Sequence, residues 1–279
     1  RIEEALARPF LIGDEITPLG ARTAVALAEP DDTAATLLRR ASDALAGHDA
    51  PSGSIAVDTL AVDLRRAMEA GEIELRFQPQ VVVATGAIVG VEALARWRHA
   101  SGEIGAGMLF AAAARAGLGL ALSGHVQRPA LPQAASWPAV LRELRLSVNV
   151  TSADVARSNF ADLFLDWVDS SGFPRVRLTV EITEGGLIGD LGEAARVLAE
   201  LRTAGCRHRI DDFGTGYSSL AYLKALPLDY LKIDRKLTQD ITGSARDRVV
   251  VRGVIDMARS LGLSEIAEGV ETQEQLDLH

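Results

Sequence analysis

The order and spacing of strand-like segments constrain the fold of this chain more than any other feature. Segments 74–83 and 87–97 are separated by Ala84-Thr85-Gly86, which is enough for a hairpin and too short for a crossover helix. We therefore expect these two strands to be antiparallel. Helix-length stretches separate the later strand-like segments, which predicts parallel βα units. Those segments are 144–150, 176–183, 208–211, 230–233 and 265–268.

The chain is expected to contain two parts joined by a linker. Residues 1–45 form a small α+β region that is too short for a domain. Its predicted elements are strands at 10–12 and 23–28 and a helix at 33–45. Residues 46–58 are small and polar, which is typical of a linker. Residues 59–279 then hold the alternating helices and strands.

Strand alternation gathers polar side chains on one face of the predicted sheet. In segment 176–183, Thr179, Glu181 and Thr183 share a face that cannot point toward surrounding helices. In a closed βα barrel, inward residues at the carboxyl ends of the strands converge on one mouth. The side chains expected to meet there are Glu92, Asn149, Glu181, Asp211, Asp212, Lys232 and Glu268.

Taken singly, each of these residues has an ordinary structural explanation, such as a turn cap, a helix cap or a neutralising partner. Taken together they do not, because burying four or more carboxylates without a cation costs roughly several kcal/mol apiece, and one lysine cannot balance them. Oxygen ligands favour Mg²⁺ or Mn²⁺. The five histidines show neither HxxxH nor HExxH spacing, so a zinc protease site is not predicted.

Charge and composition narrow the expected partners and compartment. A net charge of −9 argues against a polynucleotide partner. No run approaches the ~20 apolar residues of a membrane span, and the first residues lack a signal-peptide pattern and an initiator Met. We therefore expect a cytoplasmic fragment of a longer chain without membrane contact. The single cysteine, Cys206, is expected to be a buried small hydrophobic residue rather than a nucleophile.

Six motifs follow one another along the chain. They are Val-Glu92-Ala-Leu-Ala-Arg96-Trp, Ser-Val-Asn149-Val-Thr, Glu181-Ile-Thr-Glu184, Asp211-Asp212-Phe-Gly-Thr-Gly-Tyr-Ser-Ser-Leu, Tyr-Leu-Lys232-Ile-Asp234 and Ala-Glu268-Gly-Val-Glu271-Thr. In this order they resemble the EAL-domain cyclic di-GMP phosphodiesterases. The resemblance covers about residues 59–279 and implies an α/β fold, a TIM-like (β/α)8 barrel with an antiparallel first strand.

The resemblance also implies an activity and a role for each matching residue. The expected reaction is hydrolysis of cyclic di-GMP to linear pGpG with two Mg²⁺ or Mn²⁺ ions. The implied ligands of one metal are Glu92, Asn149, Glu181 and Asp211, and Asp212 and Glu268 complete the second site. Lys232 would hold the attacking water, Glu268 is an alternative general base, and Asp212 and Glu184 belong to the same catalytic set, Glu184 with the positioning loop 213–219. The implied substrate contacts are Gln78, Arg96, Asp234 and Glu271.

The flanking regions carry further expectations. Residues 1–45 resemble the C-terminal end of a GGDEF diguanylate cyclase domain without its signature loop, so no cyclase activity is assigned to them. Upstream GGDEF and sensor domains in the same chain, and a homodimer through the EAL domain, are also expected from the family. Only seven strands can be counted, so we expect the natural polypeptide to continue beyond His279 and supply the eighth.

Two other functions remain open from the residues. The first is a receptor that binds cyclic di-GMP without cleaving it, and the second is a Schiff-base aldolase that uses Lys232. Receptors of this type usually lose acidic ligands, whereas every acidic motif is intact here. The departures from the family pattern are Gly185, where a serine is usual, and the segment 101–118, which lacks a usual proline and an acidic pair. They fall in a loop and a helix rather than on the ligands.

Overall fold

The computed structural model describes residues 10–12, 15–17, 27, 33, 36, 53–100, 102–183, 191–214, 220–239 and 241–278. The chain divides into two compact units, residues 1–59 and 60–279, which are described separately. In the first unit, β1 (Phe10–Ile12) pairs with β2 (Glu15–Thr17) in an antiparallel ladder. The predicted strand at 23–28 and the predicted helix at 33–45 lie outside the described residues, apart from single positions.

Helix α3 (Gly53–Glu69) begins inside the segment 46–58, which the composition predicts to be a linker. The segment is rich in small residues and is therefore predicted to be a linker. It nevertheless begins a helical repeat, because Ala56, Leu60 and Leu64 follow one another at i, i+4 and i+8. Leu60 and Leu64, in the part of the helix that belongs to the second unit, are buried.

The rest of the second unit alternates strands and helices, as the spacing of the sequence predicts. The first half contains β3 (Ile73–Val81), β4 (Ile88–His99), β5 (Gly102–Ile104), α4 (Ala106–Arg115), α5 (Gly119–Ala135), η2 (Ala139–Leu141), β6 (Arg145–Val150), α6 (Ser152–Val155) and α7 (Phe160–Ser171). The second half contains η3 (Arg175–Arg177), β7 (Leu178–Thr183), α8 (Leu191–Thr203), β8 (Arg207–Phe213), α9 (Leu220–Ala225), β9 (Tyr230–Ile233), α10 (Arg235–Thr238), α11 (Ala245–Ser260), β10 (Ser264–Ala267) and α12 (Gln273–Asp277). No helix in the described part of the chain is both long and apolar enough to cross a bilayer.

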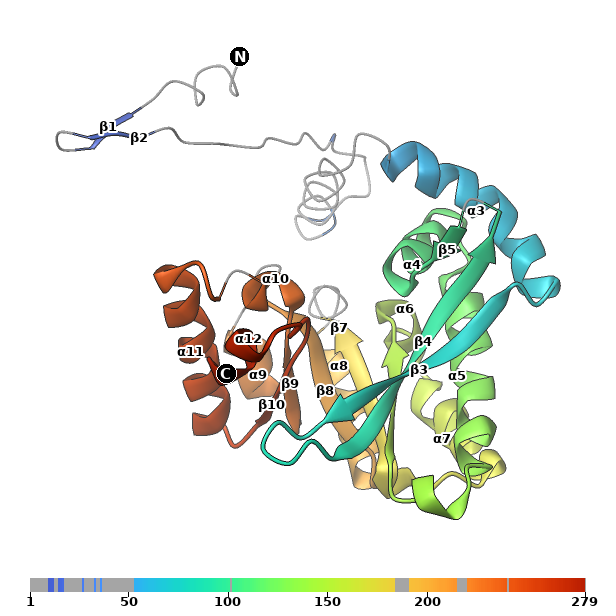
Figure 1. The fold of residues 1–279 in the computed structure, drawn as a ribbon. Helices are drawn as coiled ribbons and strands as arrows, with labels where there is room; N and C mark the ends of the chain where they lie inside the picture. The colour runs from blue at the N-terminus through green and yellow to red at the C-terminus, as the bar shows by residue number, and fades with distance from the viewer. Residues whose placement is uncertain are drawn as a thin grey trace. The chain divides into compact units, whose positions relative to one another are not determined.

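The strands form one sheet in the order β10-β9-β8-β7-β6-β4-β3, with β5 paired to the end of β4 (Figure 1). Strands β3 and β4 are antiparallel, and each later neighbour along this path is parallel, so both predictions about strand direction are confirmed. Strand β5 was not predicted. It is three residues long and contains a glycine and a glutamate, so it shows no apolar alternation.

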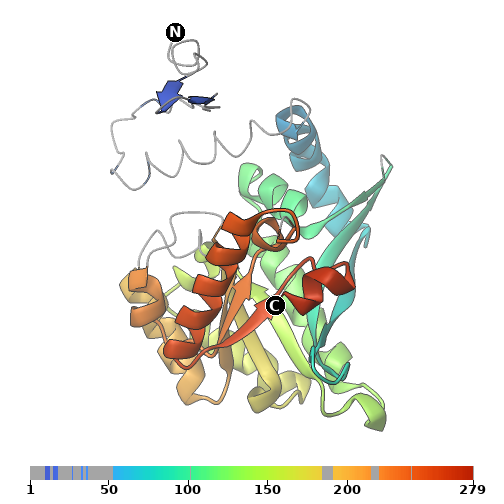
Figure 2. The same cartoon turned by 60° about the vertical axis from the view of Figure 1, so that its left-hand side comes forward.

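The sheet curls into a half-barrel with helices on its outer side (Figures 1 and 2). Its two edges are β3 and β10, and no strand pairing joins them within the described residues. These two open edges agree with the seven strands counted in the sequence, whereas closure into a (β/α)8 barrel, which requires each edge strand to find a partner, is not confirmed.

The core lies between the sheet and its outer helices. Val148 on β6, Val180 and Ile182 on β7 and Phe164 on α7 are buried in one apolar cluster with residues of α5 and α8. The alternate residues of the same strands point into the half-barrel and are polar. This division confirms the predicted parity of segment 176–183 and leaves the inner face for chemistry. Cys206 belongs to the core, and burial raises the pKa of its thiol to about 11, as expected for an unreactive residue.

His208 gives the fold a predictable response to acid. Its ring is completely buried on β8, with Nδ1 lying 3.2 Å from the Pro227 carbonyl oxygen. Burial lowers the pKa of His208 from 6.5 to about 4, so the fold favours the neutral ring. The stabilisation is complete above the unfolded pKa and is lost as the pH falls toward 4. We therefore expect the free energy of unfolding to fall by about 2 kcal/mol as the pH drops from 7 to 5, because His208 becomes protonated only in the unfolded chain.

Chemical denaturation of His208→Ile at pH 7 and pH 5 measures this effect. The variant should lose about 2 kcal/mol less than the unsubstituted protein over this interval. The same exchange at His125, a partly exposed residue on α5, is the control for the loss of a histidine outside the core. Equal acid sensitivity in both variants would show that His208 is not the responsible group.

Candidate functional site

Polar side chains from neighbouring strands meet at the carboxyl end of the half-barrel. Glu92 comes from β4, Asn149 from β6, Glu181 from β7, and Lys232 from β9. The register explains the meeting, because Asn149 lies directly beside Glu181 in the parallel pair β6–β7. Neighbouring strands thus present these side chains at nearly the same height on the inner face.

Two groups of carboxylates overlap in this cluster. Glu92, Glu181 and Asp211 form one, with one oxygen from each lying within 4.8 Å of the others. Asp211, Asp212 and Glu268 form the second group by the same criterion. Asp211 belongs to both groups, and each group could hold a divalent ion. The structure brings together all the acidic residues that the sequence places at the mouth, as far as they are described.

The position of Asp212 depends on an unusual backbone conformation. Neighbouring residues of a regular strand point to opposite faces, so Asp211 and Asp212 would normally diverge. Asp212 instead has φ +57°, and the β8–β9 register shifts between Ile210 and Phe213. Aspartate tolerates this left-handed conformation better than most residues. This left-handed conformation at Asp212 allows the carboxylates of Asp211 and Asp212 to lie on the same side, in the cluster.

Crowding of negative charge changes the protonation of Asp212. Burial, and after it the adjacent Asp211 carboxylate, raises the pKa of Asp212 to about 7. Its backbone N–H donates to Asp211 Oδ1 at 2.8 Å. A carboxyl group with this pKa is poised to exchange a proton near neutral pH.

Lys232 is the cation at the centre of the cluster. Its Nζ lies 3.0 Å from Glu92 Oε2, 3.2 Å from an Asp211 carboxylate oxygen and 3.3 Å from Glu268 Oε2. Burial alone would lower the pKa of Lys232, but the carboxylates of Asp211, Glu92 and Glu268 outweigh it and raise the pKa. The amine therefore stays protonated at neutral pH and cannot act as a nucleophile without losing this stabilisation.

The available donor atoms suit a hard divalent cation. Glu181 Oε2 is buried and has no hydrogen-bond partner among the described residues. The Asn149 amide donates from Nδ2 to Glu92 Oε1 at 3.1 Å, which leaves its carbonyl oxygen for a cation. Every candidate ligand atom is thus a carboxylate or amide oxygen, the type that Mg²⁺ and Mn²⁺ prefer.

Arg209 was missed by the sequence analysis. It lies on β8 two residues before Asp211, is completely buried, and donates from Nη2 to Glu181 Oε1. Its position was available from the sequence, because residues two apart on a strand share a face. The cluster therefore has two buried cations, Lys232 and Arg209. The sequence analysis balanced its carboxylates against the lysine alone.

Two glycines after the strands allow α10 to approach the site. Gly269, which follows Glu268, has φ +74°, and a Cβ there would meet the Arg235 side chain. Gly214, which follows β8, has φ +99°, and a Cβ there would meet the Leu237 side chain. Both positions therefore favour glycine, through the positive φ and through the close approach of α10 side chains.

The residues expected to bind substrate are less closely grouped. Gln78 lies directly opposite Glu92 in the antiparallel pair β3–β4. Arg96 lies farther along β4, where its Nε is 3.8 Å from Glu103 of β5 and its Nη1 donates to the Ala95 carbonyl at 2.9 Å.

The remaining predicted contacts lie near α10. Asp234 caps that helix by accepting from the Lys236 N–H at 2.8 Å, and it also contributes to the raised pKa of Asp212. Glu271 is exposed and lies 3.2 Å from Arg235 Nη2. Glu184 and the loop residues 215–219 lie outside the described residues.

A cleft of about 1160 Å³ opens beside the cluster, inside the half-barrel. Glu92, Lys232 and Glu268 line it together with Gln78 and Glu271. Residues of the hairpin β3–β4 and of helix α12 contribute to its lining. The cleft gives a ligand direct access to Lys232 and to two of the clustered carboxylates.

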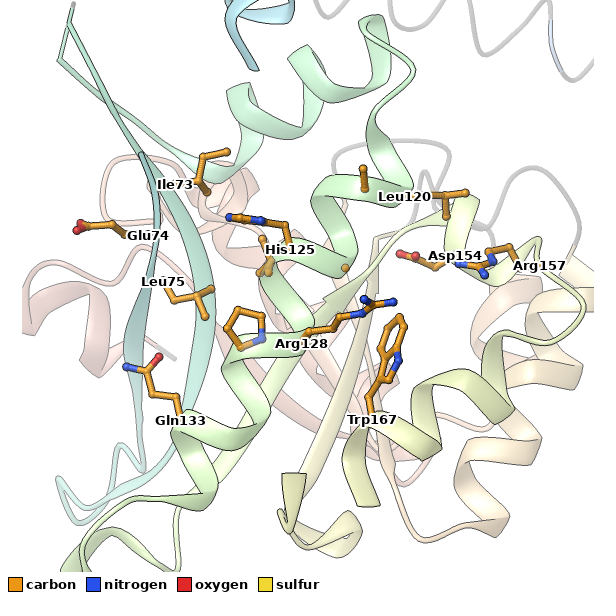
Figure 3. Close-up of a pocket in the computed structure, with 14 residues that line it drawn as sticks. Ile73, Glu74, Leu75, Leu120, His125, Arg128, Gln133, Asp154, Arg157 and Trp167 are labelled. Atoms are coloured by element: carbon orange, nitrogen blue, oxygen red, sulfur yellow. The ribbon is translucent and has the colours of Figure 1, made fainter. Parts of the chain in front are cut away.

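A second hollow, of about 860 Å³, lies between β3 and helices α5 to α7, on the outer side of the sheet (Figure 3). Its lining includes His125 and Arg128, whose guanidinium carbon is 4.3 Å from the centre of the Trp167 ring. None of the clustered carboxylates lines this hollow. The inner cleft is therefore the candidate active site.

Comparisons with known proteins relate the second unit to one family. The family model for the EAL domain matches residues 61–279. An uncharacterized protein of Mycobacterium tuberculosis is 33% identical over 290 aligned positions, which cover 98% of this chain and 46% of that protein. The cyclic di-GMP phosphodiesterase NbdA of Pseudomonas aeruginosa is 38% identical over 216 residues, covering 77% of this chain and 28% of NbdA. The chain thus spans less than half the length of these two relatives.

A solved structure shows the same architecture. The PaMucR phosphodiesterase, in its complex with c-di-GMP, is 33% identical and superposes with a TM-score of 0.73. The superposition covers 79% of this chain and 90% of that one.

Proposed function

This chain belongs to the EAL domain family, and from that premise we propose that residues 60–279 form a metal-dependent phosphodiesterase. The proposed substrate is cyclic di-GMP and the proposed product is linear pGpG. The named relatives NbdA and PaMucR support the reaction class. The observation that carries the proposal is the pair of carboxylate groups that share Asp211 beside a protonated lysine.

Each clustered residue receives a role in this proposal. Glu92, Asn149 and Glu181 would hold one divalent ion together with Asp211, while Asp212 and Glu268 would complete the site of a second. When bound, two such ions lower the pKa of a coordinated water toward about 7 and stabilise the entering and departing oxygens of an in-line displacement.

The protein groups would orient the water and take its proton. Lys232 has its ammonium group between three carboxylates, where it can donate a hydrogen bond to the attacking water. Glu268 has an alternative to its role as a ligand of the second metal: it borders both Lys232 and the cleft, and in that alternative role it would accept the water proton. Asp212 stays a proposed ligand in this scheme, because a carboxyl group that holds a divalent ion is ionised.

Substrate would enter from the cleft. Gln78 and Glu271 line it and are proposed to contact the guanine bases or ribose hydroxyls. Arg96 is proposed to bind a substrate phosphate, exchanging its 3.8 Å contact with Glu103 for hydrogen bonds to the phosphate oxygens. Asp234 is proposed to contact the substrate, and Glu184 is proposed to act with the positioning loop 213–219.

Product analysis tests the proposed function. The purified protein is incubated with cyclic di-GMP and Mg²⁺, and the nucleotides are separated by chromatography. Formation of pGpG supports the phosphodiesterase. Binding of cyclic di-GMP without cleavage would favour the receptor. Absence of both binding and turnover would reject the phosphodiesterase and the receptor alike.

Replacement of Lys232 by methionine is expected to reduce turnover about 10²- to 10³-fold, because a preorganised hydrogen-bond donor to the reacting groups is lost. The rate of pGpG formation measures this effect. Lys224→Met, on α9, is the control. Near-normal turnover in Lys232→Met would remove the lysine from the mechanism.

The aldolase alternative predicts that borohydride traps a carbonyl substrate on Lys232. We expect no trapping, because the amine is held protonated.

A further inference from the structure

Arg209 occupies a position where an unbalanced charge would be costly. It lies on β8 with its side chain inside the half-barrel, and none of its surface is exposed. Burial lowers the pKa of Arg209, and the carboxylates of Glu92 and Asp211 oppose that shift. Guanidinium groups stay charged in proteins, so Arg209 brings a fixed positive charge to the floor of the site.

Three other strands supply the contacts that hold this guanidinium. Nη2 donates to Glu181 Oε1 on β7 and to Ser147 Oγ on β6, the latter at 2.6 Å. With its amide oxygen turned toward the arginine, Gln80 on β3 accepts from the two terminal nitrogens at 2.9 and 2.8 Å. Arg209 is therefore fixed by a built arrangement of acceptors rather than placed by chance.

The contact with Glu181 separates the two oxygens of that carboxylate. Oε1 is taken by Arg209, whereas Oε2 is buried without a hydrogen-bond partner among the described residues. Glu181 is also one of the three carboxylates of the first candidate metal group. The arginine thus holds a proposed ligand by one oxygen and leaves the other oxygen available to a cation.

We propose that Arg209 is a positioning residue that fixes Glu181 and weakens divalent-metal binding at this site, while keeping the metal-free half-barrel folded. The proposal rests on the metal-dependent function proposed above. Without metal, the guanidinium and Lys232 balance part of the charge of the buried acids. With metal, the fixed charge repels the ion through a medium of low effective dielectric constant.

Two effects of removing Arg209 oppose each other, and their sizes decide the expected result. Losing the anchor frees Glu181 to rotate, which weakens metal binding slightly. Losing the positive charge removes repulsion of a doubly charged ion and strengthens binding more, because charges at short range in a protein interact strongly. We therefore expect tighter metal binding in Arg209→Met.

Mn²⁺ titration of the metal-free proteins by calorimetry, with thermal melting, tests the proposal. Arg209→Met should bind Mn²⁺ at least tenfold more tightly than the unsubstituted protein. Without metal, the variant should also melt at a lower temperature than the unsubstituted protein. Saturating Mn²⁺ should raise its melting temperature by more. Arg207→Met is the matched control, since Arg207 lies on the same strand, is exposed and donates to the Tyr230 hydroxyl at 2.7 Å. It should leave Mn²⁺ affinity unchanged.

A charge-retaining variant guards against a folding failure of Arg209→Met. Arg209→Lys keeps the positive charge and should bind Mn²⁺ within threefold of the unsubstituted protein. Unchanged or weaker binding in a folded Arg209→Met, or tenfold tighter binding in Arg209→Lys, would overturn the role of Arg209. If the unsubstituted protein binds no Mn²⁺ at all, the metal-dependent function itself fails, which is a separate result.

Discussion

Replacement of Glu92 by glutamine is expected to reduce cyclic di-GMP hydrolysis at least about 10³-fold, while the protein keeps its fold. Glu92 is a proposed ligand of the first metal and also contacts Lys232 and Asn149. Glutamine has the same shape but offers a neutral oxygen, so the ion loses one of its anionic ligands. The rate of pGpG formation at saturating Mg²⁺ measures the effect.

The metal-free variant should be at least as stable as the unsubstituted protein. The cluster holds five carboxylates against Lys232 and Arg209, so neutralising one acid reduces repulsion. Glu74→Gln is the matched control, because Glu74 lies on the neighbouring strand of the same hairpin and pairs with Arg98 outside the cluster. Near-normal turnover in Glu92→Gln at unchanged melting temperature would contradict the two-metal assignment.

Local rules allowed the order and direction of the strands to be predicted. A three-residue connection can only make a hairpin, and helix-length connections return each later strand parallel to the last. The same alternation placed Glu92, Asn149, Glu181 and Lys232 on one face, where the structure has them. Their roles as ligands and catalysts stay predictions.

Features that depend on long-range contacts could not be predicted in this way. The reversal at Asp212 requires a left-handed backbone that strand parity does not anticipate. Parity does place Arg209 inside, but an arginine there is credible only once Glu181, Ser147 and Gln80 are known to surround it, and these come from three other strands. The start of α3 was missed because its first turns resemble a linker in composition.

Removal of divalent metal is expected to abolish hydrolysis, and Mg²⁺ or Mn²⁺ should restore it, whereas Ca²⁺ should not. All three ions suit carboxylate oxygens, but Ca²⁺ prefers longer bonds and more ligands and acidifies water less. Ca²⁺ should therefore occupy the site without supporting the reaction, and added Ca²⁺ should suppress the rate in Mg²⁺. Chromatography of pGpG after EDTA treatment and readdition of each ion measures these rates.

Thermal melting separates occupancy of the site from catalysis. An ion at 100 times its dissociation constant stabilises the native state by about 2.7 kcal/mol, whether or not it supports chemistry. Ca²⁺ should thus raise the melting temperature without yielding product. Asp211→Asn is the control, because Asp211 is shared by both carboxylate groups and its neutralisation should diminish stabilisation by every ion. Equal rates in Mg²⁺, Ca²⁺ and EDTA would show that the clustered carboxylates act without a metal. An ion-induced melting shift that persists unchanged in Asp211→Asn would instead place the bound ion elsewhere in the protein.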